Sequence, residues 1–440
     1  MSVPQPKDIL FRAGGITLER FGVPVWRRAP ISRGGEEWKE TLARADGATP
    51  VATLLGRDGL YHLVAQNTLR VEWVPNIDVG DGLGPRTRAS LLLEGSRTNK
   101  LAQPLNFAAW LTANGPPAPT GGQADPFGGT GAFRLTDNSA VATQLFGVAA
   151  AFVGDGTKGM GVFLKQGTAA VTTVDLFDIT AAAKRVRIDV TWNGANAPTL
   201  TVPEGAGQTW APFAVPGAPG WWWITYNGQG IVAANANQFR VLPAGNPAGN
   251  TGTVFAYLAQ AEDGVFPSSP LPTTIARAQD ALTVPIGFGL RVPMTVLIRL
   301  VTPRYLDTGG NGVGIPGVLT IGSSQPDLRI WLPTAGGTVR AGLRDSVGGD
   351  DQSGAAHPVG PLVQAAIQIT PSGAGIVVAV DAGAGLSAPS AVAQRFNAWH
   401  DGVLHIGDLS GAVGSSAYMN LLDAVGFDGQ FALADCLAVP

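Results

Sequence analysis

The acidic side chains that could perform acid–base chemistry are spread along the whole chain. A glycan hydrolase needs two carboxyl groups at a fixed separation, one on each side of the bond that is cleaved. The carboxylates in turn-like and strand-like runs show no such paired pattern; they are Asp58, Asp175, Asp178 and Asp189. Their pairing in space stays open at this level, but the sequence favours a protein without catalytic residues.

The histidines and serines predict neither a metal site nor a nucleophile. The four histidines lack the spacing of metal ligands; they are His62, His357, His400 and His405. Ser268 and Ser269 follow Phe-Pro and do not stand in a Gly-x-Ser-x-Gly turn. The glycine-rich turns precede no expected helix, so they do not predict a phosphate site. We expect no cofactor and no enzymatic activity.

Two glycine-rich loops contain acidic residues of the kind that bind calcium. Calcium takes six or more oxygen ligands, usually from several carboxylates. Asp81 stands alone in GDGLG, whereas Asp350 and Asp351 are adjacent in GGDDQSG. We expect no bound metal, and Asp350 and Asp351 are the residues to inspect if that expectation is wrong.

Three consecutive tryptophans stand in the stretch GWWWITYNG, residues 220–228. The run has the composition of a strand, in which successive side chains point to opposite faces. Trp221 and Trp223 therefore share one face, and Trp222 shares the other with Ile224. We expect Trp222 to pack in a core.

The role of Trp221 and Trp223 has three alternatives. On an outer face their side chains would lie about 7 Å apart along the strand, which suits two successive sugar rings. The same pair suits an interface between subunits, where tryptophans are favoured anchors. Packing in the core or at its rim is the third alternative. We favour the interface, because apolar area on an outer face needs a cover.

Composition and charge exclude several classes of protein. The formal net charge of −3 gives no electrostatic basis for nucleic-acid binding. No apolar run approaches the roughly 20 residues that cross a bilayer, so we expect no membrane insertion. The first residues, MSVPQPKDIL, do not resemble a signal peptide. Cys436 is the one cysteine, so no intrachain disulfide can form.

The pattern of residues predicts an all-β protein. The 60 glycines and 33 prolines lie between short apolar runs, as in strands joined by tight turns. RVRIDVTW (185–192) alternates apolar and charged residues, and residues 36–45 are the best helix candidate. The length exceeds one ordinary core. We expect a mixed N-terminal segment (1–90) and two jelly-roll-like β-sandwiches (91–285 and 286–440).

Separate stretches together resemble a family of tailed-bacteriophage virion proteins. LLLEGSRTNKLAQPLNFAAW (91–110) is similar to a family motif of an apolar triplet, Glu, Arg-Thr-Asn and a closing Trp. GVFLKQGTAAVTTVDLFD (161–178) is similar to the family's strand-Lys-x-Gly-Thr-strand. AYLAQAEDGVFPSSPLPTTIARAQDALTV (256–284) is similar to the family's closing motif. With the segment upstream, the resemblance covers roughly residues 44–284. The matching motif residues that we single out are Glu94, Arg97, Asn99, Trp110, Phe266, Arg277 and Asp280.

The resemblance implies a fold and a role. It implies a sandwich like a carbohydrate-binding module over 91–285, and a looser laminin-G or concanavalin-like sandwich over 286–440. It implies a structural protein of a tail fibre, tail tip or head fibre, made in the host cytoplasm and located in the virion. The first 90 residues would dock to other virion proteins, and the chain would form a homotrimer that also contacts host glycans. We interpret the motif residues as structural, with arginines fixing turns.

Two alternatives to the appendage role stay open. One is a capsid decoration protein without host contact, since the same domain is mounted on heads and tails. The other is a glycan depolymerase, which a groove lined with carboxylates would favour.

Overall fold

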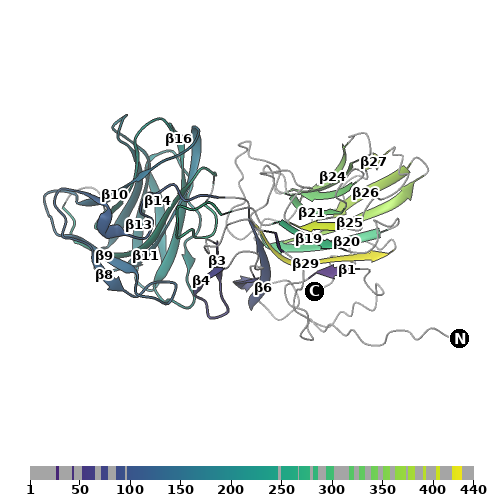
Figure 1. Cartoon of the computed structure of the whole chain (residues 1–440), viewed down its shortest axis with the longest axis horizontal. Coiled ribbons are helices and arrows are strands. Elements are labelled where there is room, and N and C mark those ends of the chain that lie inside the picture. Colours follow the sequence, from purple (N-terminus) through teal and green to yellow (C-terminus); the bar gives the residue numbers. More distant parts are fainter. Residues whose placement is uncertain are drawn as a thin grey trace. The chain divides into compact units, whose positions relative to one another are not determined.

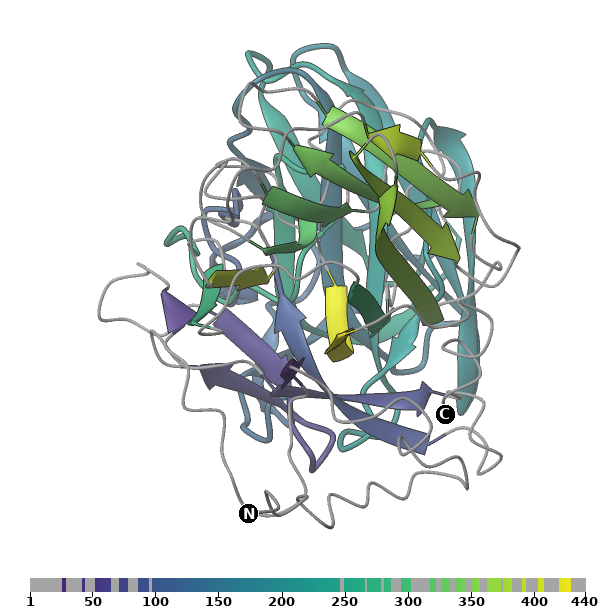
Figure 2. The same ribbon diagram turned by 90° about the vertical axis from the view of Figure 1, so that its right-hand side faces the viewer.

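The structure is a computed structural model, and it describes part of the chain in detail. The described residues are 26–28, 42–43, 52–64, 71–77, 86–94, 97–245, 249–265, 267–277, 281–285, 294–301, 317–321, 327–331, 338–344, 350–356, 362–372, 375–381, 390–392, 403–406 and 419–428. Within them almost every element is a strand, and the one helical element is the 3-10 helix η2 (Phe107–Ala109) (Figure 1 and Figure 2). The all-β prediction is confirmed. No helix in this part of the chain is long and apolar enough to cross a membrane.

The chain divides into two compact units, and each is built from separate stretches of sequence. Unit 1 contains Met1–Ala43, Leu69–Gly95 and Asp280–Pro440. Unit 2 contains Arg44–Thr68 and Ser96–Gln279. The backbone therefore passes from unit 1 into unit 2, returns, and enters unit 2 again before ending in unit 1.

Unit 2 is an antiparallel β-sandwich with an added hairpin. One six-stranded sheet has the order β14-β13-β12-β17-β10-β7, and the other has the order β15-β16-β11-β18-β9-β8. The first sheet contains β7 (Leu111–Ala113), β10 (Leu145–Ala150), β12 (Val171–Asp178), β13 (Ala183–Asn193), β14 (Asn196–Gly205) and β17 (Asn237–Leu242). The second contains β8 (Thr120–Gln123), β9 (Ala132–Asp137), β11 (Gly156–Gln166), β15 (Phe213–Ala214), β16 (Trp221–Ile231) and β18 (Gly252–Glu262). The hairpin pairs β3 (Ala52–Leu55) with β4 (Tyr61–Val64).

The main core of unit 2 is filled by alternate side chains of both sheets. On β13, Val186, Ile188 and Val190 are fully buried, as the alternation in the sequence predicts. They pack in one apolar cluster with side chains of the other sheet, among them Val162 and Leu164 of β11. Burial of these faces is the main driving force for the sandwich.

Unit 1 also consists of antiparallel sheets. One has the order β27-β26-β25-β20-β29-β6-β5, with β1 paired to β29, and the other has the order β2-β19-β28-β21-β22-β23-β24. The N-terminal strands are β1 (Trp26–Arg28), β2 (Leu42–Ala43), β5 (Val71–Ile77) and β6 (Arg86–Leu93). The others are β19 (Ala281–Pro285), β20 (Met294–Val301), β21 (Gly317–Ile321), β22 (Asp327–Trp331), β23 (Thr338–Arg344), β24 (Asp350–Ala356), β25 (Leu362–Ser372), β26 (Gly375–Asp381), β27 (Ser390–Val392), β28 (Val403–Ile406) and β29 (Met419–Asp428).

The strands of the first 93 residues do not form a unit of their own. In Figure 1, β1 and β6 lie beside β29, and the pairing joins Leu91 to Leu421 and Trp26 to Gly426. The hairpin of residues 52–64 belongs instead to unit 2. This division differs from the expected boundaries at 90/91 and 285/286, because strand pairing joins residues more than 300 positions apart, which no local pattern reports. The docking role of residues 1–90 stays a prediction.

The expected helix over residues 36–45 is wrong at its C-terminal end. Leu42 and Ala43 form β2 and pair with Leu282 and Ala281 of β19. A ten-residue helix is marginal without tertiary packing, and pairing with a distant strand satisfies the backbone instead. The rest of that stretch lies outside the described residues.

Candidate functional site

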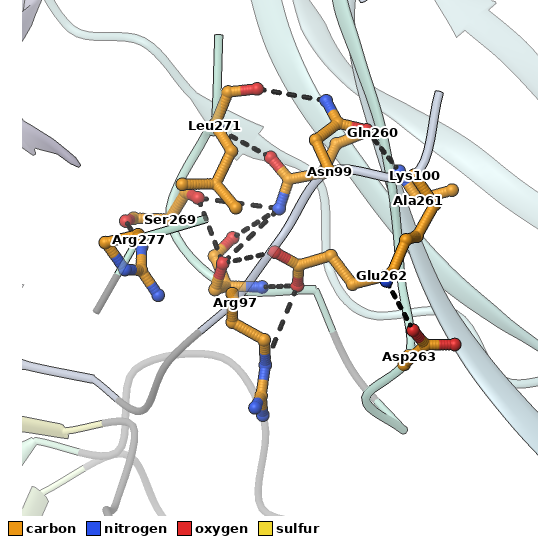
Figure 3. Close-up of polar contacts among 11 residues, drawn as sticks. Arg97, Asn99, Lys100, Gln260, Ala261, Glu262, Asp263, Ser269, Leu271 and Arg277 are labelled. Carbon is orange, nitrogen blue, oxygen red and sulfur yellow. Dashed lines mark hydrogen bonds and ion pairs between the residues drawn. The ribbon is translucent and has the colours of Figure 1, made fainter. Parts of the chain in front are cut away.

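Most of the described motif residues converge on one buried polar cluster, which we call the neck cluster. It consists of Arg97, Asn99, Gln260, Glu262, Ser268, Ser269 and Arg277, all of which except Ser268 are labelled in Figure 3. These residues come from three places in the long segment of unit 2 (Ser96–Gln279): its start, the end of β18, and the stretch that follows β18.

The backbone of Arg97 pairs directly with that of Arg277. The amide of Arg97 donates to the carbonyl of Arg277 at 2.9 Å, and the amide of Arg277 donates to the carbonyl of Arg97 at 2.7 Å. The two residues form an isolated antiparallel bridge. The first and last described residues of the long segment of unit 2 are therefore hydrogen-bonded to each other.

Asn99 joins the incoming segment to β18 and to the outgoing segment. Its Nδ2 donates to the carbonyls of Ala259 (2.9 Å) and Leu271 (3.0 Å). Its Oδ1 accepts from the amides of Leu101 (3.1 Å) and Ala261 (3.2 Å). Asn99 is almost fully buried, and its side chain uses both donors and the acceptor. The Asn99 side chain therefore holds three stretches of backbone together, namely its own segment, β18, and the segment that contains Leu271.

Glu262 is the charged centre of the neck cluster. Its carboxylate accepts from the amide (2.7 Å) and the hydroxyl (2.6 Å) of Ser268, and it lies 3.9 Å from Nε of Arg97. Burial raises the pKa of the Glu262 carboxyl above its ordinary value, and Arg97, Ser268 and Arg277 oppose that shift. Nη1 of Arg277 in turn donates to Oγ of Ser269 at 2.8 Å.

The arrangement is suited to holding backbone segments rather than to turning over a substrate. The side chains of Glu262 and Arg277 are 0% exposed, so a substrate could reach the carboxylate only if the fold opened. The Ser268 hydroxyl faces a carboxylate and not an imidazole base. The cluster therefore fits the structural interpretation of Arg97 and Arg277.

The remaining motif residues are not gathered around Glu262. Glu94 is buried one position beyond β6, within unit 1. Trp110 packs in the main core of unit 2, where its Nε1 donates to the carbonyl of Gln103 at 2.8 Å. Phe266 and Asp280 lie outside the described residues.

The tryptophan strand alternates as expected, but both of its faces are covered. Trp222 contacts the main core. Trp221 and Trp223 point the other way and are 2% and 1% exposed, because a second apolar cluster encloses them. The expected outer position of Trp221 and Trp223 is wrong, and neither indole presents a face to a sugar or to another subunit.

The β3–β4 hairpin is part of the apolar cluster that covers these two indoles. Leu55 and Tyr61 of the hairpin join Trp221, Trp223 and Phe163 in the second cluster. Polar contacts fix the hairpin in place: Thr53 Oγ1 donates to the carbonyl of Pro270 (2.7 Å), and the amide of Gly217 donates to the carbonyl of Gly59 (3.0 Å). The predicted domain boundaries placed this hairpin in the N-terminal segment (1–90). No local pattern predicted that the hairpin packs near Trp223.

The carboxylates considered for catalysis pair with basic side chains instead of with one another. Asp175 forms a bidentate pair with Arg240, at 2.6 and 2.7 Å. Asp178 bonds Arg185, Asp189 bonds Arg187, and Asp58 lies 2.9 Å from Nε2 of His62. Burial raises the pKa of Asp175, despite Arg240. The Asp175–Arg240 pair joins residues 65 positions apart, which no local pattern in the sequence predicts.

The calcium candidates gain no support from the described residues. Asp350 and Asp351 are in β24, where their backbones pair with Arg344 and Leu343; their side chains, and Asp81, lie outside what the structure describes. Across the described residues, no three His, Cys, Asp or Glu side chains gather in a way that could hold a metal ion.

A hollow of about 350 Å³ opens at one end of the β10–β17 pair. Its walls are mostly apolar and include the exposed side chains of Leu111 and Ile179, together with the amide residues Asn235, Asn237 and Gln238. No carboxylate lines this hollow, unlike the cleft that a glycan hydrolase requires.

The chain was also compared with known proteins. No protein-family model matches it, and no curated protein sequence matches it. The resemblance to phage virion proteins therefore depends on the motif residues themselves.

Proposed function

We propose that the protein is a non-catalytic structural component of a tailed-phage virion, in a tail fibre, tail tip or head fibre. The observation that supports this proposal is the neck cluster. Motif residues separated by more than 150 positions, such as Asn99 and Gln260, meet in one buried cluster. Residues of the first and the third resembling stretch therefore belong to one structural cluster, in keeping with their interpretation as structural residues.

The rest of the proposal follows the resemblance. Unit 2 corresponds to the carbohydrate-binding-module-like sandwich, and the C-terminal strands of unit 1 correspond to the laminin-G or concanavalin-like sandwich. The partners are other virion proteins and two further copies of the chain, since phage appendages are commonly symmetric trimers. The protein is made in the host cytoplasm and resides in the virion. Host glycan contact, if part of this role, uses surfaces other than Trp221 and Trp223.

Immunogold electron microscopy on intact particles tests the location. Antiserum to the recombinant protein is applied to purified particles from the source culture, with the same serum absorbed on the recombinant protein as control. We expect gold at the tail tip or fibres. Gold on fibres of the head would place the chain in a head fibre, whereas gold spread over the capsid surface would make it a decoration protein. Absence of the chain from purified particles, by label and by mass spectrometry, would refute the virion proposal.

Incubation with host surface polysaccharide tests the non-catalytic part. We expect no new reducing ends and no loss of polymer length after prolonged incubation. Depolymerisation that disappears when one of the Asp58, Asp175, Asp178 or Asp189 carboxylates is replaced by its amide would establish the depolymerase alternative.

A further inference from the structure

We infer that the neck cluster is a mechanical clamp that keeps tension in the chain away from the sandwich of unit 2. The inference concerns this unit alone and does not depend on the virion proposal. The bridge between Arg97 and Arg277 joins the two ends of a segment of 181 residues by backbone hydrogen bonds.

The path of a pulling force follows from this bridge. A force applied to the chain before residue 97 and after residue 277 meets the Arg97–Arg277 pair first. While that pair holds, the force passes from one segment to the other across two hydrogen bonds. The strands between them carry the force only after the pair has opened.

The neck cluster reinforces the pair on both sides. On the incoming side, Asn99 makes four hydrogen bonds, two of them to β18, and Arg97 lies beside the Glu262 carboxylate. On the outgoing side, Arg277 bonds Ser269, while Glu262 holds Ser268 by two hydrogen bonds. Since Glu262 is fully buried, removing its carboxylate leaves the buried amide and hydroxyl of Ser268 without their hydrogen-bond partner. Opening the pair therefore requires breaking several buried bonds within one short stretch.

Pulling single molecules of the full chain in an optical trap tests the clamp. Handles are attached at Ser96→Cys and Gln279→Cys in a Cys436→Ser background. We expect no extension until one force is reached, followed by release of the sandwich, roughly 600 Å of extended chain. In Glu262→Gln, the first extension should begin at lower force, with opening about tenfold faster at a given force.

Asp175→Asn is the matched control, because it also converts a buried carboxylate bonded to an arginine into an amide, but within the sandwich. We expect it to leave the force of the first extension unchanged. If Asp175→Asn lowers that force as much as Glu262→Gln does, the sandwich already carries load and the clamp inference is wrong. The same holds if Glu262→Gln leaves the force unchanged.

Hydrogen exchange gives a second, force-free readout and uses the milder variant Ser269→Ala, in case Glu262→Gln does not fold. We expect the amides of Arg97 and Arg277 to exchange about tenfold faster in Ser269→Ala, while the amide of Val174 in the core keeps its wild-type rate. Equal acceleration at all three amides would show global destabilisation and would contradict a local clamp.

Discussion

Gly161 lies directly beneath the indole of Trp223. A Cβ placed on Gly161 would come within 2.4 Å of Cζ2 and 2.6 Å of Cη2 of that indole. The residues are on neighbouring strands, β11 and β16, and on the face covered by the hairpin. The absence of a side chain at position 161 is therefore what gives the indole room beside β11.

Gly161→Ala should destabilise unit 2, because the methyl group cannot enter this contact without moving the indole. We expect a loss of about 1–3 kcal/mol in the free energy of unfolding, measured by urea titration. The control is the same change in a Trp223→Phe background, where the smaller ring leaves room. If Gly161→Ala costs as much there as in the wild type, the contact is not the cause.

Tyr61→Ala should detach the hairpin from the aromatic face. The Tyr61 ring stacks on Phe127 at 5.6 Å and meets the edge of Phe163 at 5.2 Å, between ring centroids. We expect a loss of about 3–5 kcal/mol, as for other buried aromatic residues. Leu63→Ala, on the same hairpin but 54% exposed, should change stability by less than about 0.5 kcal/mol. Similar losses in both variants would contradict the hairpin's role as a cover.

Trp223→Ala should change stability without changing the oligomeric state. Trp223 is 1% exposed within a single chain, so its removal leaves a cavity and does not remove a contact between copies. We expect about 3–5 kcal/mol of destabilisation, with an unchanged molar mass by light scattering below the unfolding temperature. Dissociation of the native oligomer would restore the interface interpretation of Trp223.

Arg240→Ala should lower the free energy of unfolding more than the removal of a basic residue from a more exposed ion pair. Arg240 balances the fully buried carboxylate of Asp175 and also covers the Phe177 ring, 3.9 Å from its centroid. Loss of one member of a buried pair typically costs about 3–5 kcal/mol. Lys184→Ala removes the partner of the more exposed Glu204 and should cost at most about 1 kcal/mol. Thermal unfolding of the two variants side by side provides the comparison.

Asp178 should make unit 2 sensitive to acid. Burial raises its pKa, but the hydrogen bonds from Asn235, Ala181 and Arg185 outweigh that effect and bring it to about 2, below the ordinary 3.8. Because the pKa of Asp178 is lower in the folded state than in the unfolded state, its ionised carboxylate stabilises the fold above pH 3.8. This stabilisation disappears as the pH falls toward 2. Asp178→Asn should therefore flatten the fall in urea midpoint between pH 4 and pH 2. An unchanged slope would show that other groups cause the acid sensitivity.

Local patterns in the sequence predict the strands of this protein better than their partners. Alternation in β13 and β16 indicates correctly which side chains share a face, because the period of two is a property of the strand itself. The cluster that covers the face of Trp221 and Trp223 includes Tyr61, some 160 positions away. Asn99 and Asp175 bond residues that are 160 and 65 positions away. Such contacts arise from tertiary packing, so a single sequence carries no local signal for them.

The bridge between Arg97 and Arg277 has a consequence for how such a chain can change over generations. The two ends of residues 97–277 lie side by side, as is usual for domains that tolerate insertion into another chain. A recombination event that replaced residues 97–277 would have to reproduce this pair of backbone positions and also the face that receives the β3–β4 hairpin, which lies outside the exchanged stretch. The strands on both sides, β6 and β19, could keep their sequence and their pairing while the module between them was exchanged.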